Sequence, residues 1–192
     1  VKYGPDLVHK ISLEYKKKIF LDLKLHDIPV TVAKAISSLR NLPIDFLTVH
    51  LSGGEAMLKA AMAEARVSIP HCKILGVSFL TSLEANDLNN LFGITNTEEA
   101  FLRLFKTASE SGIDGIVSSP HEVGLLKKHY PHLLSVTPGI RFRDEIEGAQ
   151  VQDQKRVMDP KEAFNAGSDY LVMGRSLTKT QNLSERLRLL KE

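Results

Sequence analysis

The sequence predicts an α/β fold in which helices cover a parallel sheet. Short apolar runs rich in β-branched and aromatic residues alternate along the chain with segments whose apolar residues recur at helical spacing. Most of these runs are apolar on both faces, which favours a parallel sheet buried under helical crossovers over an antiparallel one. The chain has 192 residues and no Ser/Pro-rich linker or internal repeat, so we expect one domain over residues 1–192.

Each predicted strand is an apolar run, and each predicted helix has apolar residues three or four positions apart. A leading helix is predicted from Pro5 to about Lys17, because proline is tolerated in a first helical turn. The predicted strands are, in chain order, Ile19–Leu25, Phe46–Leu51, Lys73–Leu80, Gly115–Ser119, Leu133–Ile140 and Tyr170–Met173. The predicted helices between them are marked by Val32, Ile36 and Leu39, by Ala56, Ala60 and Ala63, by Ala100, Leu104 and Ala108, by Val123 and Leu126, and by Ala163 and Ala166.

Composition and charge exclude several classes of protein. Apolar residues make up 43% of the chain and charged residues 25%, unlike disordered, collagenous or coiled-coil sequences. The 25 Lys and Arg against 23 Asp and Glu leave a net charge of +2, so we expect neither nucleic acid nor membrane as a partner. The longest apolar runs are far shorter than the ~20 residues of a membrane span. The single cysteine, Cys72, cannot form an internal disulfide, which suits the cytoplasm.

Charged residues interrupt the first predicted strand. With a period of two residues, its leucines lie on one face and Asp22, Lys24 and His26 on the other. A structural ion pair at a strand end is one explanation. We favour a catalytic pair, because α/β barrels place catalytic groups at the carboxyl ends of their strands and a neighbouring Asp22 keeps Lys24 protonated. Asp27 follows in the next loop, near the same rim.

Two further strand ends carry polar residues that could bind a ligand. Gly174 and Arg175 follow the last predicted strand and suit an anion, although a turn glycine and a surface arginine would look the same. Thr81 and Ser82 follow the third strand, where they could bind an imide edge or cap a helix.

Two other features are weaker indications of function. The polar stretch from Arg143 to Asp153 lacks apolar periodicity, which is typical of a mobile loop over a site. His26 and His50 lack the spacing and carboxylate neighbours of metal ligands, so we interpret both as structural, hydrogen-bonded histidines and expect no metal site.

Several segments together resemble one enzyme family. Asp22-Leu23-Lys24-Leu25-His26-Asp27-Ile28-Pro29 is similar to the Asp-x-Lys-x-x-Asp motif of the orotidine 5′-phosphate decarboxylases, which complete pyrimidine nucleotide synthesis. Matching segments follow in order as Val49-His50, Ser52-Gly53-Gly54, Leu80-Thr81-Ser82, Val136-Thr137-Pro138-Gly139-Ile140-Arg141, Asp153-Gln154 and Gly174-Arg175-Ser176. The resemblance covers the whole chain and implies a (β/α)₈ TIM barrel, of which this chain carries six of the eight strands.

The resemblance also implies a reaction and a set of site residues. The reaction is decarboxylation of orotidine 5′-monophosphate to uridine 5′-monophosphate by a carbon-carbon lyase that uses no metal or organic cofactor. Lys24 is implied as proton donor and Asp22 as the residue that orients it, while Asp27 reaches a neighbour's site across a homodimer. The implied substrate-binding residues are Thr81, Ser82, Arg141, Gln154, Gly174 and Arg175.

The chain departs from the family pattern at its beginning. Family members begin with a strand bearing an aspartate for the ribose and a second strand bearing a lysine of the catalytic network, and neither precedes the leading helix here. We therefore expect a strand-helix-strand unit to be missing. Two alternatives remain: a Mg²⁺-dependent sugar-phosphate decarboxylase or aldolase of the same superfamily, and a non-catalytic phosphate-binding remnant.

Overall fold

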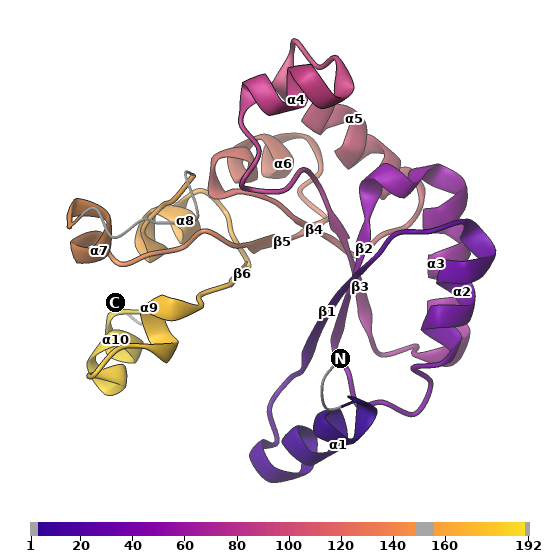
Figure 1. Ribbon diagram of the computed structural model, residues 1–192, viewed down its shortest axis with the longest axis horizontal. Helices are drawn as coiled ribbons and strands as arrows, with labels where there is room; N and C mark the ends of the chain where they lie inside the picture. Colours follow the sequence, from indigo (N-terminus) through magenta and orange to yellow (C-terminus); the bar gives the residue numbers. More distant parts are fainter. Residues whose placement is uncertain (1–3, 149–155, 191–192) are drawn as a thin grey trace. The chain divides into compact units, whose positions relative to one another are not determined.

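The computed structural model describes residues 4–148 and 156–190, and the chain divides into two compact units. The first unit comprises Val1–Ser78 and Leu104–Ile116, and the second Phe79–Arg103 and Val117–Glu192. Helix α5 (Thr97–Glu110) and strand β4 (Gly115–Val117) contribute residues to both. Figure 1 labels the helices and strands of the two units.

The first unit contains β1, β2, β3 and the start of β4, as neighbours in that order. Strand β2 is parallel to both β1 and β3, with Phe46 opposite Phe20 on one side and Lys73 on the other. Besides its parts of α5 and β4, its elements run in chain order as α1 (Gly4–Tyr15), β1 (Phe20–Leu25), α2 (Pro29–Ser37), β2 (Phe46–His50), the 3₁₀ turn η1 (Leu51–Gly53), α3 (Gly54–Ser68) and β3 (Lys73–Val77).

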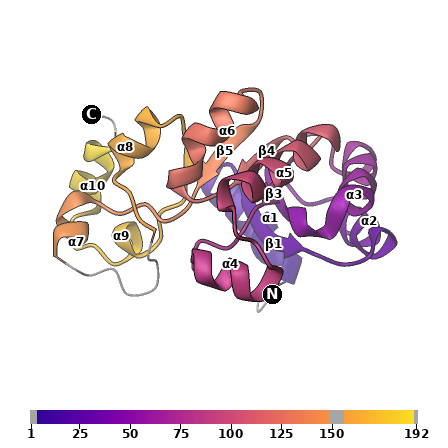
Figure 2. The same cartoon turned by 90° about the horizontal axis from the view of Figure 1, so that it is seen from above.

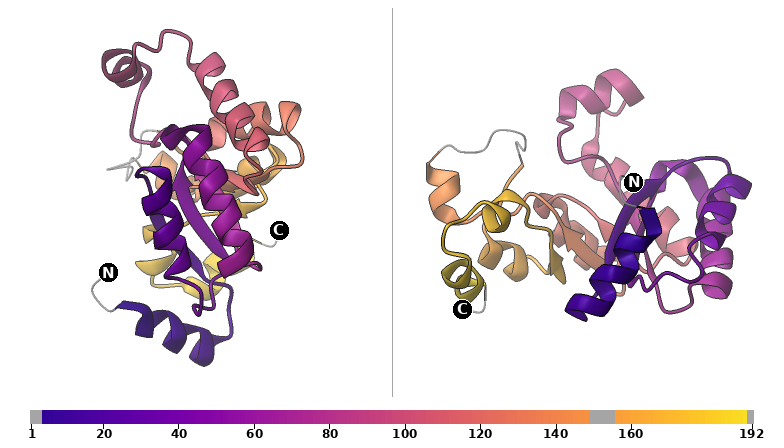
Figure 3. Two further views of the ribbon diagram at one scale, coloured as in Figure 1. Left: turned by 90° about the vertical axis from the view of Figure 1, so that its right-hand side faces the viewer. Right: turned by 60° about the horizontal axis from the view of Figure 1, so that its bottom comes forward.

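The core of the first unit lies between its strands and two helices. Helices α2 and α3 pack side by side and cover one face of β1–β3 (Figures 1 and 3). Strand β2 is buried along almost its whole length, and it pairs with a neighbouring strand on each side. Gly76 of β3 leaves the space that the Leu51 side chain occupies, because a Cβ there would collide with that leucine. Close packing therefore holds η1 directly over the end of β3.

The second unit contains the end of β4, followed by β5 and β6. Strands β5 and β6 are parallel, with Val136 opposite Tyr170. Its remaining elements are α4 (Ala85–Phe92), the 3₁₀ turn η2 (Pro120–Glu122), α6 (Val123–His129), β5 (Leu134–Thr137), α7 (Arg143–Glu147), α8 (Pro160–Asn165), β6 (Tyr170–Leu171), α9 (Arg175–Thr178) and α10 (Leu183–Leu189). Figure 2 shows α7, α9 and α10 beside one another.

Three aspartates, which lie just before β2, β4 and β6, bind the backbone at the starts of the neighbouring strands β1, β3 and β5. The Oδ2 atoms of Asp45, Asp114 and Asp169 accept the amide hydrogens of Ile19, Ile74 and Ser135 at 2.7, 2.8 and 2.7 Å. Each aspartate also donates its own amide to the carbonyl of that same partner, at 2.9 to 3.0 Å. The motif occurs in both units, and it sets the register at which neighbouring parallel strands begin.

The structure confirms the six predicted strands and the leading helix, and it corrects their ends. The strand predicted to reach Leu80 ends at Val77, and the last predicted strand ends at Leu171 rather than Met173. Apolar runs continue past the last ladder bonds into loops, so composition overestimates strand length. Helix α4 was not predicted; a reciprocal cap between Glu84 and Asp87 begins it, and Gly93 ends it in the left-handed region.

Candidate active site

In the first unit, a hydroxyl group of β2 holds the acid–base pair of β1. Lys24 Nζ pairs with Asp22 Oδ2. The hydroxyl of Thr48, a fully buried residue, donates to Asp22 Oδ1 at 2.9 Å and accepts the backbone amide of Lys24 at 2.8 Å. Thr48 therefore fixes both members of the pair. Sequence reasoning missed this residue, although a hydroxyl inside an otherwise apolar strand must find a partner.

The backbone of β1 is irregular at Lys24. This residue has φ +50°, in the left-handed region that non-glycine residues rarely adopt, and the pairing of β1 with β2 shifts register between Leu21 and Leu25. The strict alternation predicted for this strand is therefore wrong. Leu23 is 40% exposed instead of facing the core with the other leucines, because the irregularity redirects the side chains.

The exposure of the ion pair helps to distinguish structural from functional readings. The side chains of Lys24 and Asp22 are 40% and 43% exposed, so the pair is not buried. An ion pair this exposed contributes little to stability. The left-handed backbone at Lys24 costs free energy, and an exposed ion pair does not stabilise the fold enough to offset that cost. This balance favours a functional role for the pair over a structural one.

Two histidines stack beside this pair. The rings of His26 and His50 lie 5.1 Å apart, centroid to centroid, at 38°, and Ser52 Oγ lies 3.5 Å from His26 Nε2. Burial lowers the pKa of His50, and the nearby His26 and Lys24 lower it further. The His50 ring is therefore neutral at pH 7, and it adds no charge beside Lys24.

Asp27 lies in the connection between β1 and α2. It is exposed, and its Oδ1 accepts the amide of Ile28, the residue that precedes α2, at 2.6 Å. Pro29 begins α2, so the chain turns away immediately after Asp27.

In the second unit, Thr81 and Ser82 occupy a turn that Leu83 closes by donating its amide to the Leu80 carbonyl at 2.9 Å. The helix-capping alternative for these two residues is wrong, because Glu84 caps α4.

Arg141 and Arg175 line one cavity of about 450 Å³ in the second unit. Gly174 precedes α9, and a Cβ on it would meet nothing within 4 Å, so packing does not explain the glycine. The prediction that Gly174 and Arg175 directly follow the last strand is wrong. Strand β6 ends at Leu171, and Arg175 is the first residue of α9. The other residues of the cavity are Asp144, Glu145, Ser176, Lys179, Thr180 and Arg186.

The predicted loop over the site is helical in its first part. Helix α7 begins at Arg143, where Glu145 Oε2 accepts the amide of Phe142 at 2.9 Å. Local capping therefore overrides the missing apolar periodicity. The rest of the predicted loop and Gln154 lie outside the described residues.

The structure brings the predicted site residues together in two groups. Asp22 and Lys24 form a bonded pair in the first unit, and Arg141 and Arg175 share a cavity in the second. Within the part of the chain that the structure describes, no group of three His, Cys, Asp or Glu could hold a metal ion. In the same part, no helix is long and apolar enough to cross a membrane.

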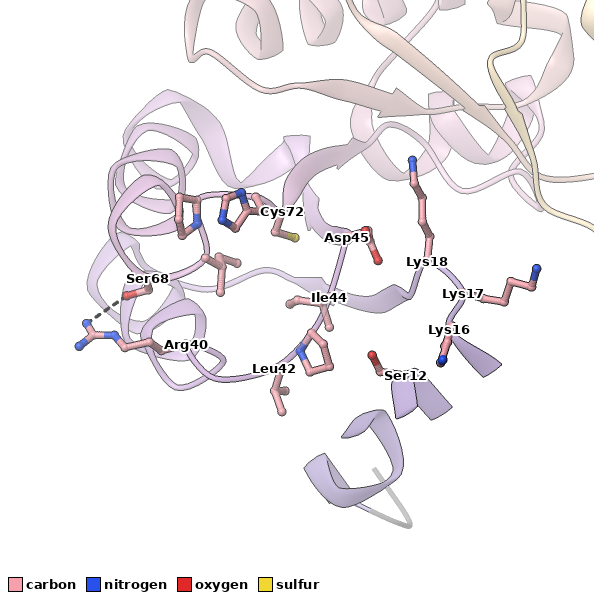
Figure 4. A pocket seen from close by; sticks show the side chains of 14 residues that line it. Ser12, Lys16, Lys17, Lys18, Arg40, Leu42, Ile44, Asp45, Ser68 and Cys72 are labelled. Carbon is pink, nitrogen blue, oxygen red and sulfur yellow. Dashed lines mark hydrogen bonds between the residues drawn. The ribbon is translucent and has the colours of Figure 1, made fainter. Parts of the chain in front are cut away.

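A second cavity, of about 460 Å³, lies in the first unit beyond the amino ends of its strands. Lys16, Lys17 and Lys18 line part of it, after the end of α1. Figure 4 shows their side chains pointing in different directions, with Arg40 on the far side next to Ser68. The cations do not converge on one point, so we assign no anion site to this cavity.

Comparison with known proteins identifies the family. A family model described as "Orotidine 5'-phosphate decarboxylase / HUMPS family" matches residues 1–190. An orotidine 5′-phosphate decarboxylase of Fusobacterium nucleatum is 42% identical over 193 residues, covering 98% of this chain and 78% of the relative. One of Geobacillus sp. strain WCH70 is 41% identical over 187 residues, covering 93% of this chain and 75% of the relative.

A solved structure agrees with these relatives. The crystal structure of orotidine 5′-phosphate decarboxylase from Lactobacillus acidophilus matches with a TM-score of 0.81 and 36% identity, over 98% of this chain and 80% of that one. This match and the alternation of parallel strands with helices confirm the predicted barrel-type α/β fold. The chain belongs to the orotidine 5′-phosphate decarboxylase / HUMPS family.

Proposed function

We propose that this protein decarboxylates orotidine 5′-monophosphate to uridine 5′-monophosphate, as a carbon-carbon lyase in a single decarboxylase domain. The observation that carries the proposal is the ion pair of Asp22 and Lys24 on β1, which the Thr48 hydroxyl holds in place. The chain that bears this pair is 42% identical to an orotidine 5′-phosphate decarboxylase over 98% of its length. This match favours the decarboxylase over the Mg²⁺-dependent alternative.

Lys24 is the proton donor in this proposal. When the bond between C6 of the pyrimidine and the carboxylate carbon breaks, its electron pair remains on C6 and CO₂ leaves. No conjugated group accepts that pair, so the site must stabilise the charge with preorganised groups and supply a proton. The ammonium of Lys24 donates that proton to C6, and the neutral amine then recovers one from solvent. The step requires no metal or organic cofactor.

Asp22 and Thr48 position the donor. The carboxylate of Asp22 holds the ammonium, and the Thr48 hydroxyl restricts the carboxylate to one orientation. The Thr48 contact to the Lys24 amide supports the left-handed backbone from which the side chain extends. This arrangement meets the requirement that reacting groups be oriented before the reaction begins.

The cavity of the second unit takes the phosphate group. Arg141 and Arg175 supply guanidinium donors, and the open space at Gly174 allows an oxygen close approach to the backbone. Thr81 and Ser82 bind the imide edge of the pyrimidine in this proposal, and Gln154 bridges phosphate and pyrimidine. Phosphate contacts far from C6 then contribute binding energy that organises the site for the reaction.

The assembly proposed is a cytoplasmic homodimer with shared sites. Asp27 is exposed, and its described hydrogen bond is to the adjacent Ile28 amide, so its second oxygen can reach a partner. Exposed apolar side chains lie next to it, with Ile28 67% and Val30 61% exposed. Such a surface supports contact with a second copy, and a two-fold axis would place each Asp27 reciprocally.

The test is an absorbance assay of orotidine 5′-monophosphate consumption by the complete polypeptide in the presence of EDTA. The proposal expects turnover that EDTA does not reduce. Loss of activity in EDTA, with turnover of a keto-sugar phosphate when Mg²⁺ is restored, would favour the superfamily alternative. Tight binding of uridine 5′-monophosphate without any turnover would favour the non-catalytic alternative.

A further inference from the structure

Arg186 of α10 makes a two-point contact with α7 at the edge of the cavity. Its Nη1 and Nη2 donate to Asp144 Oδ1 and Oδ2 at 2.7 and 2.6 Å, and its guanidinium carbon lies 4.4 Å from the centre of the Phe142 ring. This is the parallel, planar geometry in which arginine binds a carboxylate most strongly. The contact joins residues 42 positions apart in the chain.

The burial of Arg186 is unusual for its helix. None of the residues of α10 is buried, yet the Arg186 side chain is only 20% exposed, whereas Asp144 is 63% exposed. The arginine thus lies against Phe142 while the carboxylate stays in contact with solvent. The Arg186 hydrogen bonds lower the pKa of Asp144, so this carboxylate is ionised at neutral pH.

Asp144 has the wrong sign of charge for a phosphate cavity. The lining carries four cations and two carboxylates: besides Arg186, Arg141, Arg175 and Lys179 are positively charged, and Asp144 and Glu145 are negatively charged. The Glu145 carboxylate accepts the amide of Phe142, which caps α7. An Asp144 carboxylate without its cation would repel a phosphate dianion bound in the same cavity, and the double charge of the dianion doubles the repulsion that a single charge would give.

We propose that Arg186 is a positioning residue of the phosphate subsite, which cancels the charge of Asp144 and holds that carboxylate against α10. The inference rests on the proposed function, because it takes the cavity of Arg141 and Arg175 as the phosphate subsite. Arg186 lines the cavity, but both of its Nη atoms donate to Asp144, so it acts on the substrate through that carboxylate. Its effect therefore depends on the phosphate group of the ligand and on the presence of the Asp144 carboxylate.

The test uses four variants of the complete polypeptide: Arg186→Gln, Asp144→Asn, the double variant, and Arg188→Gln as a control that removes a positive charge from the same helix. Calorimetry measures Kd for uridine 5′-monophosphate and for uridine, and kinetics measure kcat and KM for orotidine 5′-monophosphate. Arg186→Gln should weaken the nucleotide about tenfold and uridine less than about twofold, with the loss of kcat/KM residing in KM. The double variant should recover nucleotide binding to within about threefold of wild type, and Arg188→Gln should change it less than about threefold.

Several results would overturn the inference. Equal losses for nucleotide and uridine, failure of Asp144→Asn to rescue Arg186→Gln, or equal effects of Arg186→Gln and Arg188→Gln would each do so. If Arg186→Gln does not fold, Asp144→Asn alone decides: retained or tighter nucleotide binding supports the inference, and a tenfold loss contradicts it. Wild-type turnover is measured first, so an inactive wild type refutes the proposed function, whereas an active wild type with an unaffected Arg186→Gln refutes the present inference.

Discussion

Replacing Asp114 should show how much of the stability comes from the aspartates that bind neighbouring strands. The Asp114 side chain is 9% exposed and accepts the amide of Ile74 at 2.8 Å. Its other oxygen contacts Arg66 at 2.9 Å and Lys73 at 3.3 Å. Asp114→Ala removes all of these contacts and leaves the amide of Ile74, a fully buried residue, without its carboxylate acceptor.

The expected loss can be divided between the amide bond and the ion pairs. A hydrogen bond to a charged group contributes about 1.5–3 kcal/mol, and a buried donor left unpaired costs about as much. The side chains of Arg66 and Lys73 are 45% and 52% exposed, so each pair adds at most about 1 kcal/mol. We expect Asp114→Ala to lower the free energy of unfolding by about 3 kcal/mol. Asp114→Asn, whose amide oxygen still accepts the Ile74 hydrogen, should lower it by about 1 kcal/mol.

Thermal and urea unfolding measure the difference. A chain of this length loses about 2–4 °C in Tm per kcal/mol, so the alanine variant should melt about 6–12 °C lower and the asparagine variant about 2–4 °C lower. Asp6→Ala, which removes an exposed aspartate, is the control and should change little. If the asparagine variant melts as low as the alanine variant, the ion pairs and not the amide bond hold the strands.

Four further predictions concern the proposed site and the cysteine. Lys24→Ala should abolish nearly all turnover and leave binding of uridine 5′-monophosphate measurable; activity above about a tenth of wild type, a loss under about 1.4 kcal/mol, would exclude Lys24 as the proton donor. Arg175→Ala should lower kcat/KM for the phosphorylated substrate at least about a hundredfold and scarcely affect the nucleoside, whereas equal losses would make Arg175 structural. Inactive Lys24→Ala and Asp27→Ala subunits should regain activity when mixed, because one hybrid site recovers both side chains; mixtures that stay inactive after proven subunit exchange would refute a shared site. Burial raises the pKa of Cys72 to about 12, so a thiol reagent at pH 8 should label it only after denaturation, and rapid labelling of the native protein would contradict that burial.

The sequence alone identified the elements whose signal is local. The apolar runs at Phe46–His50 and Lys73–Val77 are strands, and the leading helix forms within a few residues of its expected bounds. Strands and helices of this kind depend on neighbours along the chain, and their periodicity is therefore visible in the order of residues. The pairing of Asp22 with Lys24 was also predicted, although the regular alternation behind that prediction breaks at Lys24.

Other features were decided by contacts between distant parts of the chain. Thr48 binds residues 24 and 26 positions away, Asp114 binds an amide 40 positions away, and Arg186 binds a carboxylate 42 positions away. The left-handed backbone at Lys24 likewise accompanies a register shift against β2. No local pattern specifies these partners, because a polar side chain satisfies its hydrogen bonds with whichever groups folding brings within about 3 Å. The residue types of the proposed site could therefore be predicted from sequence. The residues that hold them in place by hydrogen bonds, such as Thr48 and Arg186, are determined only by the packing of strands and helices.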